Sequence, residues 1–206
     1  MEDDLLVSPV FLDYMNNSLD QYRENEEVFQ VTGHMWPVDV ECEDDAFLVP
    51  LSNSLGWGTW QRAWKKFDVT AAEWSKVASD PGLRSEFDLR GRFPFASMME
   101  RQLRGQTDSW AIRWYLTVFL SKALVLYPRK SLVVNIGFDG VGTHSIRVDE
   151  ERYGTSYSTV PVQRYPNVTP NVRALEAIAN FLSRDGSLLM RVRRKFIRLV
   201  SSALPK

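Results

Sequence analysis

The apolar stretch WAIRWYLTVFLSKALVLY, residues 110–127, constrains the fold more than any other segment of this chain. Its length invites comparison with a membrane span, but Arg113 and Lys122 interrupt it and Pro128 ends it. The stretch therefore predicts a buried helix that runs into a strand. The chain has 206 residues, 44% of them hydrophobic, which is enough for one domain with a sizeable core.

Strand and helix patterns alternate along the rest of the chain. Strands are expected at 28–32, 46–51, 125–127 and 132–136, and helices after Ser8-Pro9, at 94–104, from Thr107 and from 169 to 185. The segment LGWGTWQRAWKKF places Trp57, Trp64 and two further aromatic side chains near one helical face, and Thr70 with Glu73 predicts a capping box. Mixed elements joined by long loops favour an α/β or α+β layer over a helical bundle.

Charge is unevenly distributed along the chain. Residues 1–45 contain thirteen acidic residues and one basic residue, whereas residues 184–206, which end in a predicted basic amphipathic helix, contain seven basic residues and one acidic residue. Both segments could be solvated surfaces. Alternatively, the acidic segment could bind a cation and the basic tail could bind anionic lipid. The net charge of −1 indicates no nucleic-acid partner. A single cysteine, Cys42, permits no internal disulfide, and we expect a cytoplasmic protein.

Three carboxylates, Glu2, Asp3 and Asp4, precede the first predicted helix. Acidic residues in such a position can bind Mg²⁺ or Mn²⁺ through one or two carboxylates, with water and phosphate oxygens completing the coordination. The alternative is an acidic terminus that is solvated or favourably placed near the helix N-terminus.

Two further motifs carry candidate chemistry. In TDSW, Asp108 is predicted to lie in the first turn of a long helix. An ionised carboxylate at this position, beside Trp110, could act as a general base. Alternatively, Asp108 only stabilises the helix and Trp110 belongs to the core. The loop NIGFDGVGTH, which includes Gly140 and Gly142, lets the backbone approach a ligand closely, although it lacks the spacing of a known nucleotide fingerprint. His144 could be a metal ligand, a phosphate contact or a hydrogen-bonded loop histidine.

Five segments in this order resemble a known family: EDDLLVSPVFLDYMNNSLDQY, VTGHMWP, SLGWGTWQRAWKKFD, GQTDSWAIRWY and LYPRKSLVVNIGFDGVGTH. Over roughly residues 2–145 the chain resembles the C-terminal half of a bacterial family 2 type glycosyltransferase of the GT-A fold. It is also distantly similar to the N-acetylglucosaminyltransferase that starts hybrid N-glycans. In those enzymes an acidic triplet ends a central strand and holds Mn²⁺ against the diphosphate of the sugar donor.

The resemblance implies a role for each matching residue. Glu2, Asp3 and Asp4 match the metal-binding triplet, with Asp4 the direct ligand of Mn²⁺ or Mg²⁺, and Asp108 matches the base that deprotonates the acceptor. Trp57 and Trp110 match aromatic positions near the sugars, and Gly140, Gly142 and His144 fall in the loop near the diphosphate, where His144 could also bind the metal. The implied reaction is an inverting transfer from a nucleotide-diphosphate sugar to a glycan or lipid-linked acceptor.

The sequence begins at the triplet, so the resemblance leads us to expect that the family's N-terminal nucleotide-binding strands are missing. We therefore expect an α/β fold with a partial GT-A-like mixed sheet flanked by helices over 1–168, and a helical extension over 169–206. The missing half could precede Met1 in a longer protein, or a separate chain could supply it, and the C-terminal basic helix could contact the inner face of the membrane. The alternative function is a non-catalytic carbohydrate- or protein-binding remnant.

Overall fold

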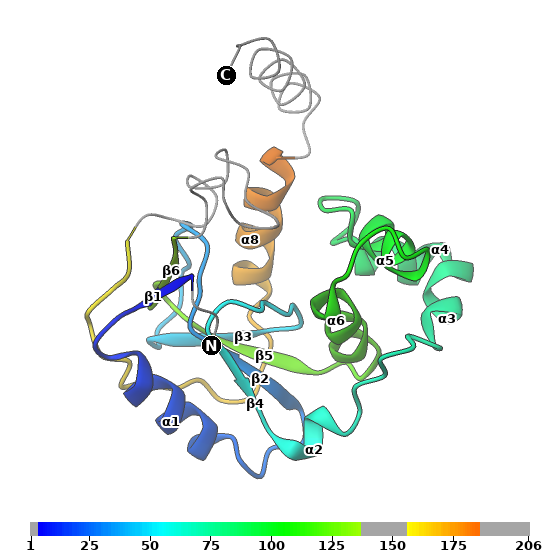
Figure 1. The fold of residues 1–206 in the computed structure, drawn as a ribbon. Helices are drawn as coiled ribbons and strands as arrows, with labels where there is room; N and C mark the ends of the chain where they lie inside the picture. The colour runs from blue at the N-terminus through cyan, green and yellow to red at the C-terminus, as the bar shows by residue number, and fades with distance from the viewer. Residues whose placement is uncertain (1–3, 137–155, 186–206) are drawn as a thin grey trace, which may run out of the picture.

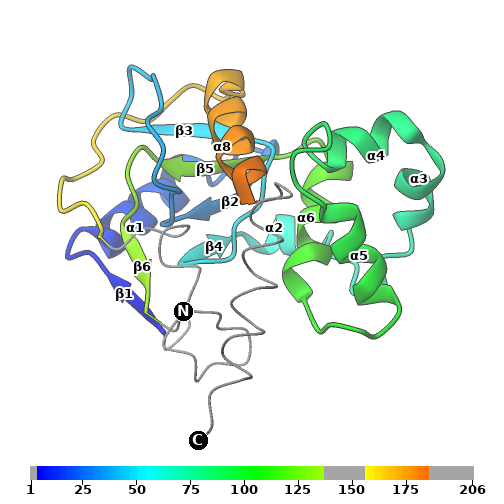
Figure 2. The ribbon, with the colours of Figure 1, turned by 90° about the horizontal axis from the view of Figure 1, so that it is seen from above.

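A four-stranded mixed sheet forms the centre of the computed structural model, which describes residues 4–136 and 156–185 (Figures 1 and 2). Helix α1 lies on one side of the sheet, and α6 and α8 lie on the other. The protein therefore has a mixed α/β fold with helices on both faces of the sheet, as the pattern of strands and helices predicts.

The elements follow one another in a strand-rich first part and a helical middle part. In chain order they are β1 (Leu5–Val7), α1 (Phe11–Gln21), β2 (Val28–Thr32), β3 (Ala46–Val49), β4 (Trp57–Thr59), α2 (Gln61–Trp64), α3 (Trp74–Ser79), α4 (Pro81–Phe87), α5 (Phe95–Leu103), α6 (Trp110–Leu120), β5 (Leu124–Pro128), β6 (Val133–Asn135) and α8 (Val172–Asp185).

The strand order of the sheet is β3-β5-β2-β4, in which only the central pair, β2 and β5, is parallel. Val31 on β2 pairs with Leu126 on β5, and Thr32 at the end of β2 pairs with Trp57 at the start of β4. A second sheet joins β1 to β6 in antiparallel register, with Leu5 opposite Asn135. The carboxyl ends of β2 and β5 therefore open onto the same edge, toward the loops that lead to β4 and β6.

The two faces of the sheet bury separate apolar clusters. On β5, Leu124 and Leu126 pack with α1, whereas Val125 and Tyr127 pack into the larger cluster shared with α6 and α8. Every residue of β2, β3 and β5 is buried. Burial on both faces explains why these strands read as nearly continuous apolar runs rather than as alternating ones.

The helix that runs into a strand is confirmed by α6 and β5. Lys122 adopts a left-handed φ of +51°, and the Ala123 N–H donates to the Val118 carbonyl at 2.9 Å, so the helix ends and the chain turns into β5. Within residues 4–136 and 156–185, no helix is both long and apolar enough to cross a membrane.

Several local expectations are wrong. Trp57 lies in strand β4 rather than on a helix, because it pairs with Thr32, and the helix that follows is limited to α2. The expected Thr70/Glu73 capping box does not form; Asp68 accepts the Thr70 and Ala72 N–H groups at 2.8 Å each, and α3 begins only at Trp74.

The helix expected after Thr169-Pro170 is confirmed as α8, which begins two residues later. The Asn171 side chain accepts the Ala174 N–H at 2.9 Å. Ala174 and Ile178 are fully buried in the same cluster as Phe47 on β3. The proposed boundary at residue 168 stays a prediction, and the expected basic helix after Gly186 lies outside the described residues.

Candidate functional site

Asp4 lies at the start of the small β1–β6 sheet. Its carbonyl accepts the Ile136 N–H at 2.8 Å, which extends the register in which Leu5 faces Asn135. The Oδ1 atom of the Asp4 side chain is buried and has no hydrogen-bond partner among residues 4–136 and 156–185. Glu2, Asp3 and His144, the other residues expected at a metal, lie outside the described residues, as do Gly140 and Gly142.

A buried carboxylate oxygen without a partner is unfavourable, and a bound ion is one of the few arrangements that compensates it. Mg²⁺ and Mn²⁺ accept hard oxygen ligands and can be held by one or two carboxylates together with substrate phosphates. Residues 4–136 and 156–185 contain no cluster of three His, Cys, Asp or Glu side chains that could hold a metal by themselves. The Asp4 carboxylate thus fits a divalent cation that shares its coordination with a ligand, rather than a closed protein cage.

Trp57 and Trp110 lie against each other, with ring centroids 5.0 Å apart and an interplanar angle of 25°. β4 supplies Trp57 and the first residue of α6 supplies Trp110, so two elements distant in sequence build the pair. Both side chains are partly buried, which leaves part of their surface accessible. Trp114 packs beneath Trp57 at 6.0 Å and Trp64 at 5.3 Å. An aromatic platform of this kind can pack against the apolar face of a sugar ring.

Asp108 is exposed and lies before α6, not in its first turn. Ser109 is the N-cap residue, with an extended backbone, and its N–H donates to the Gln102 side-chain oxygen. The helix therefore begins later than expected because Gln102 on α5 holds the preceding segment extended. Asp108 is two residues before Trp110 in the sequence, and its side chain is exposed.

The Trp pair and Asp4 are linked through Gly56. The Gly33 N–H donates to the Gly56 carbonyl at 2.7 Å, at the carboxyl end of β2. A Cβ added to Gly56 would lie 2.8 Å from Val133 Cγ1, so this backbone touches β6. From Val133 to the residue opposite Asp4 is three strand residues, about 10 Å. The candidate residues thus follow the edge at which β2 and β5 end, where α/β sheets generally bind ligands.

A buried polar network supports this edge from within the larger core. The Trp114 indole N–H donates to Gln30 Oε1 at 2.8 Å, and the Gln30 amide donates to the Asn53 carbonyl. Asn53 Nδ2 lies 2.7 Å from His34 Nδ1, and Asn53 Oδ1 accepts the Leu55 N–H at 3.0 Å. Gln30 and His34 are fully buried. The network ties α6 to the loop that carries Gly56 and leads to Trp57 at the start of β4.

Sequence reasoning missed this network. His34 stands alone among residues that predict an exposed acidic loop, and no Cys or His neighbour marks it as a site. The available signal was Gln30, a polar residue in the middle of an otherwise apolar strand, which needs a buried partner.

Part of the acidic N-terminal region has a structural role. Asp45 accepts the Gln163 and Arg164 backbone N–H groups at 3.1 and 3.0 Å, and these bonds, led by that from Arg164, lower the pKa of the Asp45 carboxyl. Glu41 pairs with Arg173 of α8 at 3.0 Å. Asp45 thus holds the later chain next to the start of β3, whereas the Glu41–Arg173 pair is highly exposed and adds little stability.

No protein-family model matches this chain, and no curated protein matches its sequence.

Proposed function

We propose that this chain is a metal-dependent, inverting glycosyltransferase of the GT-A type, or its metal- and acceptor-binding half. The observations that carry the proposal are Asp4 Oδ1, which is buried without a partner among the described residues at the start of the β1–β6 sheet, and the stacked Trp57–Trp110 pair at the end of β2. A buried carboxylate and a separate aromatic platform match the two halves of a nucleotide-sugar: a diphosphate held through a cation, and a sugar ring.

In this proposal Asp4, with Glu2, Asp3 and His144, holds Mn²⁺ or Mg²⁺, and Gly140 and Gly142 let the backbone approach the diphosphate. When bound, the cation offsets the negative charge that develops on the leaving diphosphate. Trp57 and Trp110 orient the donor and acceptor sugars by stacking. The half-buried position of both rings excludes water from one side of the reacting groups.

Asp108 acts as the general base. Its carboxylate accepts the proton of the acceptor hydroxyl, whose oxygen forms the bond to the anomeric carbon as the bond from that carbon to the diphosphate oxygen breaks. The exposed position of Asp108 ahead of α6 suits this role, because a carboxylate that receives a proton from a bound acceptor must reach the ligand side of the Trp pair.

The proposal includes a nucleotide-binding half that precedes this part of the fold or comes from a separate chain. It places the protein in the cytoplasm, where the basic C-terminal segment could bring it to anionic lipid and to lipid-linked acceptors.

The first test measures binding of UDP and GDP by calorimetry with and without Mn²⁺, using the given chain and the longest in-frame chain that contains it. We expect Mn²⁺-dependent binding that Asp4→Asn weakens at least tenfold. Asp13→Asn, which removes an exposed carboxylate on α1, is the matched control and should bind normally. Absence of Mn²⁺-dependent nucleotide binding in both forms would refute the proposal.

The second test measures release of nucleoside diphosphate from UDP- and GDP-sugars in the presence of saccharide acceptors. Asp108→Asn should retain donor binding but lower the transfer rate by roughly 10²–10⁴-fold. If Asp108→Asn transfers normally, the base assignment is wrong. If the chain binds glycans in the presence of EDTA and shows no turnover, the non-catalytic carbohydrate-binding alternative replaces the enzyme.

A further inference from the structure

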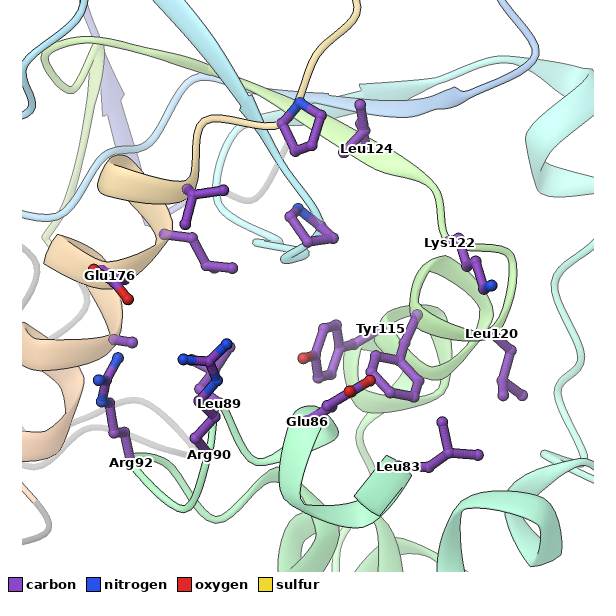
Figure 3. A pocket seen from close by; sticks show the side chains of 16 residues that line it. Leu83, Glu86, Leu89, Arg90, Arg92, Tyr115, Leu120, Lys122, Leu124 and Glu176 are labelled. Carbon is purple, nitrogen blue, oxygen red and sulfur yellow. The ribbon is translucent and has the colours of Figure 1, made fainter. Parts of the chain in front are cut away.

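A cavity of about 620 Å³ lies between α4, the C-terminal end of α6 and the first turns of α8 (Figure 3). Its volume is within the range of about 300–1,000 Å³ typical of small-molecule sites. Leu124, the first residue of β5, lines it, whereas the proposed sugar site lies at the opposite, carboxyl end of that strand. The cavity is therefore separate from the site described above.

The walls of the cavity are apolar and come from four separate segments of the chain. They consist of Pro50, Leu83, Leu89, Tyr115, Phe119, Leu120, Leu124, Pro170, Val172, Leu175 and Ala179. Tyr115 is 3% exposed and its hydroxyl already donates to the Phe87 carbonyl at 3.1 Å, so it presents an apolar ring rather than a polar group. Val172 stays 62% exposed although it lies at this wall. Such walls suit an aliphatic chain.

Charged side chains surround these walls. Arg90 and Arg92 extend from the turn after α4 toward α8, and Lys122 lies at the end of α6 (Figure 3). Two carboxylates, Glu86 and Glu176, also line the cavity, so cations exceed anions by three to two. Within residues 4–136 and 156–185 none of the three cations makes an ion pair, in contrast to Arg84, which pairs with Glu100 at 2.7 Å. The two guanidinium groups are therefore available to a ligand.

The backbone that presents these cations is unusual. Leu89, Arg90 and Gly91 have φ values of +51°, +58° and +76°, and Lys122 has +51°. L-residues rarely adopt this left-handed region, yet three of the four non-glycine residues that do so in the described chain line this cavity. The left-handed backbone conformation is therefore maintained at Arg90 and Lys122, the two residues that it places at the edge of the cavity.

We propose that this cavity binds an anionic amphiphile, with its aliphatic chain against Tyr115, Phe119 and Leu175 and its carboxylate or phosphate head on Arg90 and Arg92. Arginine guanidinium groups bind such heads through paired, charge-assisted hydrogen bonds. The inference does not depend on the proposed transferase activity, because neither Asp4, Asp108 nor the Trp pair lines the cavity.

The test measures binding of four ten-carbon probes by calorimetry below their micellar concentrations: decanoate, decyl phosphate, decanol and decyltrimethylammonium. Both anionic probes should bind at least tenfold more tightly than decanol, and the cationic probe should bind most weakly. Equal affinity for all four probes, or tighter binding of the cation, would overturn the assignment.

Two variants locate the ligand, and a third is the control. Arg90→Asn combined with Arg92→Gln should weaken the anionic probes at least tenfold and leave decanol unchanged; asparagine tolerates the left-handed φ of position 90. Val172→Trp should fill the cavity and weaken all probes. Arg101→Gln, on the exposed side of α5, should change nothing. Wild-type affinity in either of the first two variants, once circular dichroism shows that they fold, refutes the site.

A final experiment distinguishes a membrane lipid from a free acid as the source of the anionic head group. If the head belongs to a membrane lipid, the protein should co-sediment with vesicles that contain phosphatidylglycerol but not with pure phosphatidylcholine vesicles, and the Arg90/Arg92 variant should lose this binding. If the ligand is a free acid, decanoate should bind and sedimentation should not depend on Arg90 and Arg92. Absence of both decanoate binding and Arg-dependent sedimentation contradicts the proposal.

Discussion

Replacing Gln30 with Met tests whether the buried polar network stabilises the edge that carries the candidate site. Gln30 is fully buried at the centre of β2, accepts the Trp114 indole N–H at 2.8 Å and donates to the Asn53 carbonyl. Methionine has nearly the same length and volume but can neither accept nor donate a comparable hydrogen bond. The substitution therefore leaves two buried polar groups without partners while it changes the packing little.

The expected loss follows from those two groups. A buried donor that loses its partner costs about 1–3 kcal/mol, and the Asn53 carbonyl adds about 1 kcal/mol. We therefore expect Gln30→Met to lower the free energy of unfolding by about 2–4 kcal/mol. Gln106→Met, at an exposed position, is the matched control and should stay within about 0.5 kcal/mol of wild type.

A double-mutant cycle with Trp114→Phe separates the hydrogen bond from general disruption of the core. Each single variant orphans one partner of the bond, but the double variant removes both, so its loss should be smaller than the sum by about 1–2 kcal/mol. Urea unfolding followed by circular dichroism measures all four proteins. Losses that add to within about 0.5 kcal/mol would show that the two side chains do not stabilise each other, and the reasoning would fail.

Three further predictions concern stability and are measured by urea unfolding. Gly56→Ala should lower the free energy of unfolding by about 2–4 kcal/mol, because φ is +56° and the new Cβ would lie 2.8 Å from Val133 Cγ1. The control Gly105→Ala, with φ +67° and open space around the new Cβ, should lower it by only about 1 kcal/mol. Equal losses in the two variants would contradict the packing argument. Asp45→Asn should lose about 0.5–1 kcal/mol at pH 7, because backbone N–H groups lower the pKa of Asp45. This contribution is present above the unfolded pKa of about 3.9 and shrinks as the pH falls through the lowered folded value, so a difference that stays constant as the pH falls below about 3.9 would contradict it. Burial raises the pKa of Asp88, whose Oδ1 accepts the Ala96 N–H at 2.6 Å, so its ionised form opposes folding as the pH rises through that pKa. Asp88→Asn should therefore be at least as stable as wild type at pH 8, whereas Asp88→Ala should be less stable; a less stable Asn variant would refute the burial argument.

The sequence predicts the elements whose burial is uniform along their length. The run over 110–127 predicts both α6 and β5, because an apolar segment that is interrupted at Lys122 can only be buried as two elements. Val28–Thr32 is a strand as expected, ended by Gly33. Local patterns suffice here because β2 and β5 are buried on both faces and most of α6 is buried.

Local patterns fail where a distant residue decides the conformation. Trp57 repeats with Trp60 and Trp64 at helical intervals, yet pairing with Thr32 makes it part of β4. Asp108 fits a helix start by sequence, but the side chain of Gln102 fixes the preceding backbone and moves the start to Trp110. Neither partner is within five residues in the chain, so no short-range signal could have identified it.

The candidate site illustrates the same division. Trp57 and Trp110 are expected near sugars from a resemblance of motifs, and the structure brings them into contact across 53 residues of sequence. One of the two residues that hold them, Gln30, lies outside both motifs. Trp114, one turn after Trp110, anchors α6 to Gln30, and Gln30 anchors the loop that leads to Trp57. Because both anchors lie in the sheet core, a substitution that breaks this network should alter ligand binding at the Trp pair without touching a residue that contacts the ligand.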